Sequence, residues 1–184
     1  MKNYIINSDL MKTNFKRSIL NYFSVSPAFM WSQSLKELFI QIKLAHRHDS
    51  PGCLELKNQE IKVETNKIFF RGYCVQGDIP IKFELNIDLF DEVLSKEAIV
   101  NSGSVGRITL IVPKKQSPKY WRSVYKDGVT VPNNMKIWIE INEKYENELE
   151  PYKEEEEELQ NSKRNEKNKG KRRRKKGQNN KKDL

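Results

Sequence analysis

The stretch that decides the fold is Ile79-Pro80-Ile81-Lys82-Phe83-Glu84-Leu85-Asn86-Ile87-Asp88-Leu89, in which every second residue is apolar. A β-strand directs alternate side chains to opposite faces, so this pattern puts six apolar groups on one face. A helix would scatter the same six groups around its circumference. The stretch therefore predicts a strand with one buried face.

Shorter segments with the same alternation lie on both sides of this stretch, at residues 38–44, 61–63, 68–75 and 108–112. Turn residues separate them, and no long helical period competes between residues 27 and 140. Several short alternating strands with turns between them indicate an all-β fold. We expect one domain over residues 27–140, an antiparallel β-sandwich of about seven to eight strands.

Charge is distributed unevenly along the 184 residues, whose formal net charge is +9. Residues 161–184 hold twelve Lys or Arg and two acidic residues, and the rest is close to neutral. The high isoelectric point therefore does not indicate a basic nucleic-acid-binding fold. Glutamates crowd residues 141–160, where like charges repel, and the basic segment has almost nothing apolar. We expect residues 141–184 to form a disordered tail, acidic and then basic.

Residues 1–26 are mixed and polar, and we expect a flexible leader there, with a cleaved signal peptide as the alternative. A signal is suggested by basic residues ahead of a short apolar run at 19–25, although polar residues interrupt that run. No run of about 18 apolar residues occurs, so we expect no membrane span. The two cysteines, Cys53 and Cys74, are too few for a disulfide scaffold, and the sequence leaves open whether they form one bridge.

One cluster of polar residues raises the question of a metal site, because His46, His48, Asp49 and Cys53 fall close together. Zinc sites usually combine two ligand pairs, and no second pair follows. Asp49-Ser50-Pro51-Gly52 is typical turn chemistry, which favours a polar loop. Phosphate-binding loops, carboxylate pairs and nucleophile–base arrangements are also lacking. We expect no metal, no cofactor and no enzymatic activity.

Five short motifs occur in order between residues 27 and 140. They are Pro27-Ala-Phe-Met-Trp31-Ser-Gln33 and the segments 81–90, 106–115, 120–126 and 134–140. Together they resemble the CS domain, a sandwich related to small heat-shock proteins. In particular they resemble the twenty-three-kilodalton co-chaperone family. That family has a Trp in its tail motif, and Trp138 stands at the corresponding place here. The resemblance implies a non-enzymatic co-chaperone that binds the ATP-closed state of heat-shock protein 90 and assists the folding of client proteins.

The candidate partner-binding residues come from the last three of these motifs. Trp31 should pack in the core. Trp138 lies beyond the last clear strand, so it either folds back on the sheet or docks on a partner, and the resemblance favours docking. Trp121 closes the sandwich edge by packing, with partner contact as the alternative. The residues assigned to partner binding are Lys114, Lys115, Trp121, Arg122, Lys126, Met135 and Trp138.

The end of the chain supports two alternative functions. Its polybasic run consists of Lys171, Arg172, Arg173, Arg174, Lys175 and Lys176. Such a run could bind an import receptor or contact RNA non-specifically, which suits a nuclear or nucleic-acid-associated module. We expect a cytoplasmic or nuclear location, with the endoplasmic-reticulum lumen as the alternative. Lys181-Lys-Asp-Leu184 is an imperfect copy of the Lys-Asp-Glu-Leu retention signal, and the leader and cysteines would fit that compartment.

Overall fold

The computed structural model describes residues 24–54, 56–76, 79–103 and 106–179. Side chains are described up to residue 162, apart from those of 76 and 79. The leader predicted over 1–26 therefore lies outside the described residues except at its end, where Ser24 already starts the first strand.

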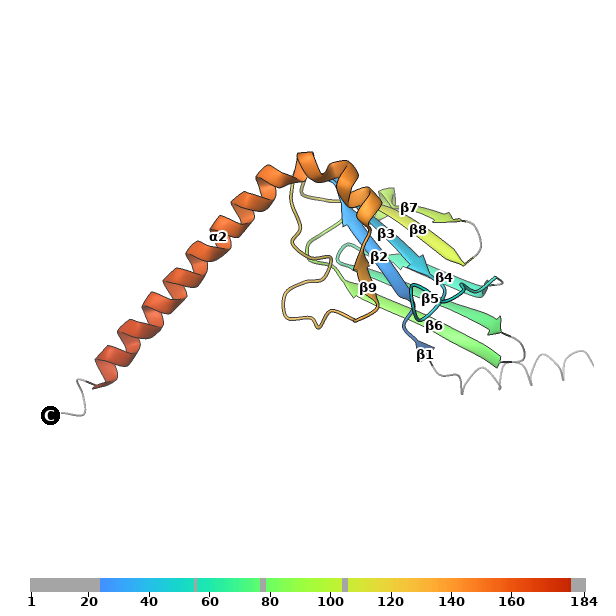
Figure 1. The fold of residues 1–184 in the computed structure, drawn as a ribbon, viewed down its shortest axis with the longest axis horizontal. Coiled ribbons are helices and arrows are strands. Elements are labelled where there is room, and N and C mark those ends of the chain that lie inside the picture. Colours follow the sequence, from blue (N-terminus) through green and yellow to red (C-terminus); the bar gives the residue numbers. More distant parts are fainter. Residues whose placement is uncertain (1–23, 55, 77–78, 104–105, 180–184) are drawn as a thin grey trace, which may run out of the picture.

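Two β-sheets make up the folded unit (Figure 1), one with strand order β1-β6-β5-β4 and one with order β7-β8-β3-β2-β9. This confirms the predicted all-β sandwich, with nine strands among the described residues. A short 3-10 helix, η2, and a long helix, α2, complete the elements. The bounds are β1 (Ser24–Val25), β2 (Ala28–Gln33), β3 (Glu37–Lys43), β4 (Leu56–Val63), β5 (Lys67–Gln76), β6 (Ile79–Asp88), η2 (Ser95–Glu97), β7 (Ile99–Ser102), β8 (Arg107–Pro113), β9 (Met135–Ile137) and α2 (Ile139–Asn179).

The decisive stretch forms β6, and its alternate side chains are buried as predicted. Phe83, Leu85 and Ile87 are at most 3% exposed. They face a core that also receives alternate residues of β3 and β8, so both sheets contribute to one hydrophobic interior. Trp31 on β2 is buried there as well. Most pairings are antiparallel, but the two short edge strands β1 and β9 pair in parallel with β6 and β2.

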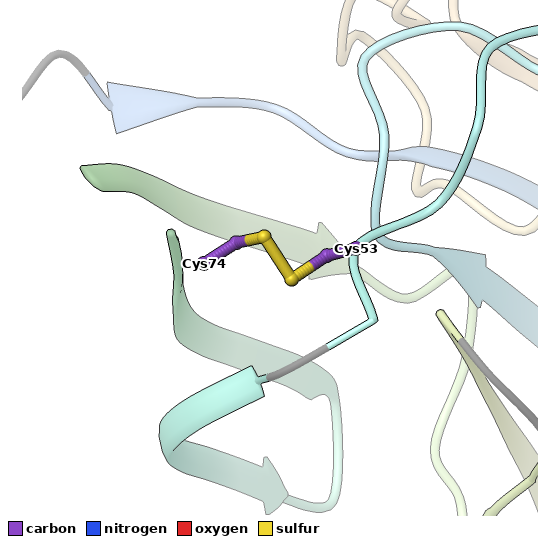
Figure 2. Close-up of a disulfide and its surroundings, with 2 residues drawn as sticks. All are labelled: Cys53 and Cys74. Carbon is purple, nitrogen blue, oxygen red and sulfur yellow. A yellow bond between two sulfur atoms is a disulfide. The ribbon is translucent and has the colours of Figure 1, made fainter. Parts of the chain in front are cut away.

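The loop after β3 is tied to the other sheet by a disulfide between Cys53 and Cys74 (Figure 2). Both cysteines are buried, and Cys74 lies on β5. The same loop passes close to Gly106. If Gly106 were replaced by a residue with a side chain, its Cβ would lie 2.9 Å from the Cys53 carbonyl oxygen. Gly106 also has a φ of 78°, in the left-handed region that favours glycine. This loop is therefore fixed by covalent and steric constraints that the sequence left open.

Residues 141–162, the first part of the tail that the sequence analysis expects to be disordered, belong to helix α2. Tyr145 stacks on Phe39 with ring centroids 5.5 Å apart, and Leu149 is 5% exposed. These helix residues are four apart, hence on one face, and their packing on the sandwich outweighs the local repulsion between glutamates. The Leu35 amide also donates to Glu148 Oε1 at 3.1 Å.

Farther along, α2 contains Pro151, and Figure 1 shows the helix bending and then pointing away from the sheets. Proline removes a helical hydrogen bond and commonly produces such a bend. Beyond residue 162 only backbone is described, so the expectation that the basic segment has no packed core stays a prediction. None of the described helices is both long and apolar enough to cross a membrane.

Candidate partner-binding surfaces

Trp138 lies at the junction between β9 and α2 and is half-buried. Its backbone N–H donates to the Trp31 carbonyl at 2.8 Å, and its own carbonyl accepts from Asn142 N at 2.9 Å. The chain on either side is exposed and apolar, because Ile137 and Ile139 are 46% and 61% exposed. The backbone of Trp138 is thus held by the sandwich while apolar surface remains open around it. Met135 is half-buried and packs against the core.

The assignment of Trp121 to partner contact is not supported by its position, since the side chain is 1% exposed. Its backbone N–H donates to Gln33 Oε1 at 2.9 Å, and Gln33 Nε2 donates to the Trp121 carbonyl at 2.5 Å. The ring centroid lies 5.8 Å from that of Phe90. This reciprocal pair and the ring contact fix Trp121 in the core, which agrees with the packing interpretation.

Lys114 also departs from its predicted place on a basic edge, because it is 2% exposed. Its Nζ donates to Gln33 Oε1, to the Ser34 carbonyl and to the Lys119 carbonyl, each at 2.7 Å. A protonated amine has three N–H groups, so all three acceptors are satisfied. Burial lowers the pKa of Lys114 to about 7, against the attraction of Glu148. The side chain therefore links parts of the sandwich and is unavailable to a partner.

The other predicted bases lie on the surface but are mostly paired. Lys115 contacts Glu92 at 2.5 Å. Arg122 pairs with Asp127, lies 3.7 Å from Glu156, and stacks over Phe90. Among the described ion pairs, none involves Lys126, which is exposed. Of the predicted basic edge, Lys126 alone is both exposed and outside the described ion pairs. The exposed ion pairs of Lys115 and Arg122 contribute little to stability.

We expect Lys114 to make the free energy of unfolding rise with pH above neutrality. Below about pH 7 the lysine is protonated in both states. Between about pH 7 and 10 the unfolded chain keeps the proton that the folded chain has lost, which gives a positive slope of up to about 1.4 kcal/mol per pH unit. Urea unfolding of wild type and Lys114→Met at several pH values in this range should show the slope only in wild type.

The slope ends near pH 10, where the unfolded lysine also loses its proton. Tyr125, whose pKa burial raises to about 12, then adds a slope of the opposite sign. Above about pH 10 the unfolded tyrosine ionises first, so its contribution lowers stability as the pH rises further. Equal slopes for wild type and Lys114→Met below pH 10 would contradict the lowered pKa of Lys114.

A depression of about 650 Å³ lies between the loop after β3 and the start of β9. The sequence interpretation treated this loop as a turn and did not connect it with residues 132–136. Among the described residues, no three His, Cys, Asp or Glu side chains are grouped as metal ligands. The adjacent His46-Arg47-His48 was the one available signal of a basic site. The lining residues are Ser26, His46, Arg47, His48, Asp49, Pro132, Asn133, Asn134 and Lys136.

Of the comparisons with known proteins, only the one with solved structures found proteins similar to this chain. No protein-family model matches the chain, and no curated protein matches it. The nuclear movement protein of E. cuniculi GB-M1 is 19% identical, covering 53% of this chain and 98% of that one, with a TM-score of 0.36. Heat shock protein 16.0 of Schizosaccharomyces pombe is 13% identical, with coverage of 59% and 99% and a TM-score of 0.42.

The CS domain of the human KIAA1068 protein is 14% identical, with coverage of 59% and 85% and a TM-score of 0.37. Two of these neighbours are named as a heat shock protein and as a CS domain. They do not single out the twenty-three-kilodalton co-chaperone family. At these identities and scores they carry no conclusion about function.

Proposed function

We propose that this chain is a non-enzymatic, chaperone-like domain that binds the ATP-closed state of heat-shock protein 90 and assists the folding of clients. The proposal is supported by the five ordered sequence motifs and by the β9–α2 junction. There, Ile137 and Ile139 expose apolar surface beside a half-buried Trp138. Aromatic residues on such surfaces are frequent binding hot spots. A partner that prefers one state of the chaperone shifts its conformational equilibrium towards that state.

We expect Trp138→Ala to weaken binding to heat-shock protein 90 by roughly 30- to 1,000-fold, since truncating a hot-spot aromatic costs about 2–4 kcal/mol. The measurement is affinity capture of the purified chaperone with a nonhydrolysable ATP analogue and without nucleotide. Val75→Ala is the matched control, because Val75 is 43% exposed on the other sheet. Equal capture without nucleotide, or by the Trp138 variant, would contradict the proposal.

A second candidate, a chaperone of the endoplasmic-reticulum lumen, is favoured by the Cys53–Cys74 disulfide. Structural disulfides persist mainly in oxidising compartments. The partner would then be the luminal paralogue of heat-shock protein 90 or an unfolded secretory client. Capture with both paralogues separates the two candidates, and mass spectrometry after alkylation of freshly lysed cells reads the native thiol state.

The nucleic-acid alternative concerns the polybasic run at 171–176, whose side chains lie outside the described residues. Contact with RNA or an import receptor therefore stays a prediction. Deleting residues 161–184 should abolish salt-sensitive RNA binding if that role is correct, and should leave chaperone capture intact if the sandwich carries the function.

A further inference from the structure

The depression beside β9 is held open by hydrogen bonds that its own walls make. Asn134 Nδ2 donates to the carbonyls of Ser26 and Pro27, both at 2.9 Å. This fixes the segment before β9 against the start of β2. From the opposite wall, His48 Nε2 donates to the Asn134 carbonyl at 2.9 Å, and His46 Nδ1 donates to the Ser26 carbonyl at 3.2 Å. Both walls are therefore fixed in place without a ligand.

The charged side chains that line this depression have a positive sum, from Arg47 and Lys136 against Asp49. None of the ion pairs among the described residues involves Arg47 or Lys136, both exposed on its rim, and Asp49 is the one carboxylate in the lining. Lys43 Nζ adds a third cation close by, donating to the His48 carbonyl. Burial is the main cause that lowers the pKa of His48; Lys136 and Lys43 lower it further, while the hydrogen bond to Asn134 and the charge of Asp49 oppose them.

The second ring nitrogens of His46 and His48 are additional polar atoms that a ligand in the depression could contact. Each ring uses one N–H on a backbone carbonyl, so each keeps a second nitrogen that can take a proton when an anion approaches. The carbonyl partners fix which nitrogen that is. An anion in the depression would therefore meet two permanent cations and up to two further N–H donors.

The size and modest charge of the depression indicate which anion fits. A phosphate polymer is held by a longer track of cations than Arg47 and Lys136 provide. A volume of about 650 Å³ accommodates a few side chains of a peptide. Val131, which precedes the lining residue Pro132 in the sequence, is apolar and 43% exposed. Glu156, an acidic residue of this chain's own helix α2, lies 3.7 Å from Arg122 and is not among the residues that line the depression.

We propose that the depression between the loop after β3 and the start of β9 binds an acidic, extended peptide segment of a partner protein, with Arg47 and Lys136 contacting its carboxylates. The site does not rest on the function proposed above, because Trp138 lies beyond the other end of β9. Electrostatic complementarity of this kind mainly sets orientation and association rate, and makes binding sensitive to salt.

The two histidines of the chain are both in this depression, so their imidazole NMR signals report on the site without interference from the basic tail. The probe is a short synthetic peptide of alternating Glu and Val, with a matched Gln-Val peptide as the neutral control. Titrated into the full chain, the Glu peptide should shift both imidazole signals saturably. The Gln peptide should not.

Removing the cations tests the assignment of residues. Arg47→Gln with Lys136→Gln should weaken binding of the Glu peptide by roughly tenfold for each charge-assisted hydrogen bond that is removed. Lys57→Gln with Lys96→Gln removes the same charge from exposed positions elsewhere and should leave binding unchanged.

Three outcomes would overturn the proposal. The imidazole signals could stay unmoved while the Glu peptide binds, which would assign binding to the basic tail. Inorganic phosphate or an RNA oligonucleotide could shift them where the Glu peptide does not, which would assign the site to phosphate. They could also shift with protein concentration alone, which would make a second copy of this chain the occupant.

Discussion

Trp121→Ala should lower the free energy of unfolding by about 3–5 kcal/mol, the range for removing a large buried aromatic from a core. The indole is 1% exposed and contacts the Phe90 ring. Lys114 Nζ lies 5.6 Å from its centroid, so truncation also removes the aromatic face beside that buried cation. Urea unfolding of the full chain, followed by circular dichroism, measures the loss as a lower midpoint at unchanged slope.

Two other substitutions serve as controls for that loss. Trp121→Phe keeps an aromatic ring and removes an indole N–H that has no hydrogen-bond partner among the described residues, so the loss should stay below about 2 kcal/mol. Trp138→Ala should cost less than about 1 kcal/mol, because that indole is half-buried at the sandwich surface. If Trp121→Ala unfolds at the same urea concentration as Trp138→Ala, Trp121 does not belong to the core.

Sequence reasoning succeeded where a pattern repeats along a single segment. The alternation at 79–89 predicts both that β6 is a strand and which of its faces is buried, because strand side chains alternate regardless of what lies opposite. The burial of polar residues, in contrast, cannot be read from a local pattern. Ser32 and Gln33 on β2 are polar and nevertheless at most 4% exposed. The burial of Gln33 depends on Trp121, 88 residues away, which no local pattern contains.

The same distance effect explains the wrong placement of Lys114. A lysine at the end of a strand is usually exposed, and the motif resemblance supplied its position without its surroundings. Its acceptors come from Gln33, Ser34 and Lys119, brought together by the β2–β3 turn and the segment after β8. Lys136 in the depression beside β9 was missed for a similar reason, since its companions His46 and Arg47 lie some ninety positions earlier.

Helix α2 was missed because charge masked a spacing that the sequence does contain. Tyr145 and Leu149 are four residues apart, but glutamates surround them. An isolated helix of this composition is marginal, and packing of one face supplies most helical stability in proteins. That packing requires Phe39 on β3, whose outward side chain only the folded sheet presents to Tyr145. The tail could thus be assigned correctly only with the tertiary partner in view.

We expect loss of the Cys53–Cys74 disulfide to lower the free energy of unfolding by about 3 kcal/mol. A cross-link restricts the unfolded chain, and for the 21-residue separation here the loop-closure estimate gives about that value. Urea unfolding should be compared for the oxidised chain, the chain reduced with a dithiol, and Cys53→Ala with Cys74→Ala. Alanine is chosen because a serine hydroxyl would be buried in the apolar core.

The reduced chain and the double alanine variant should agree to within about 1 kcal/mol, since a common loss then comes from the cross-link and the remainder from small cavities. With a typical stability of about 5–15 kcal/mol, the reduced domain would still fold, so the disulfide is not required for the fold in a reducing compartment. If reduction leaves the unfolding midpoint unchanged, the bridge does not stabilise the loop that carries His46 and His48. The preference for an oxidising compartment would then rest on the thiol state measured in cells.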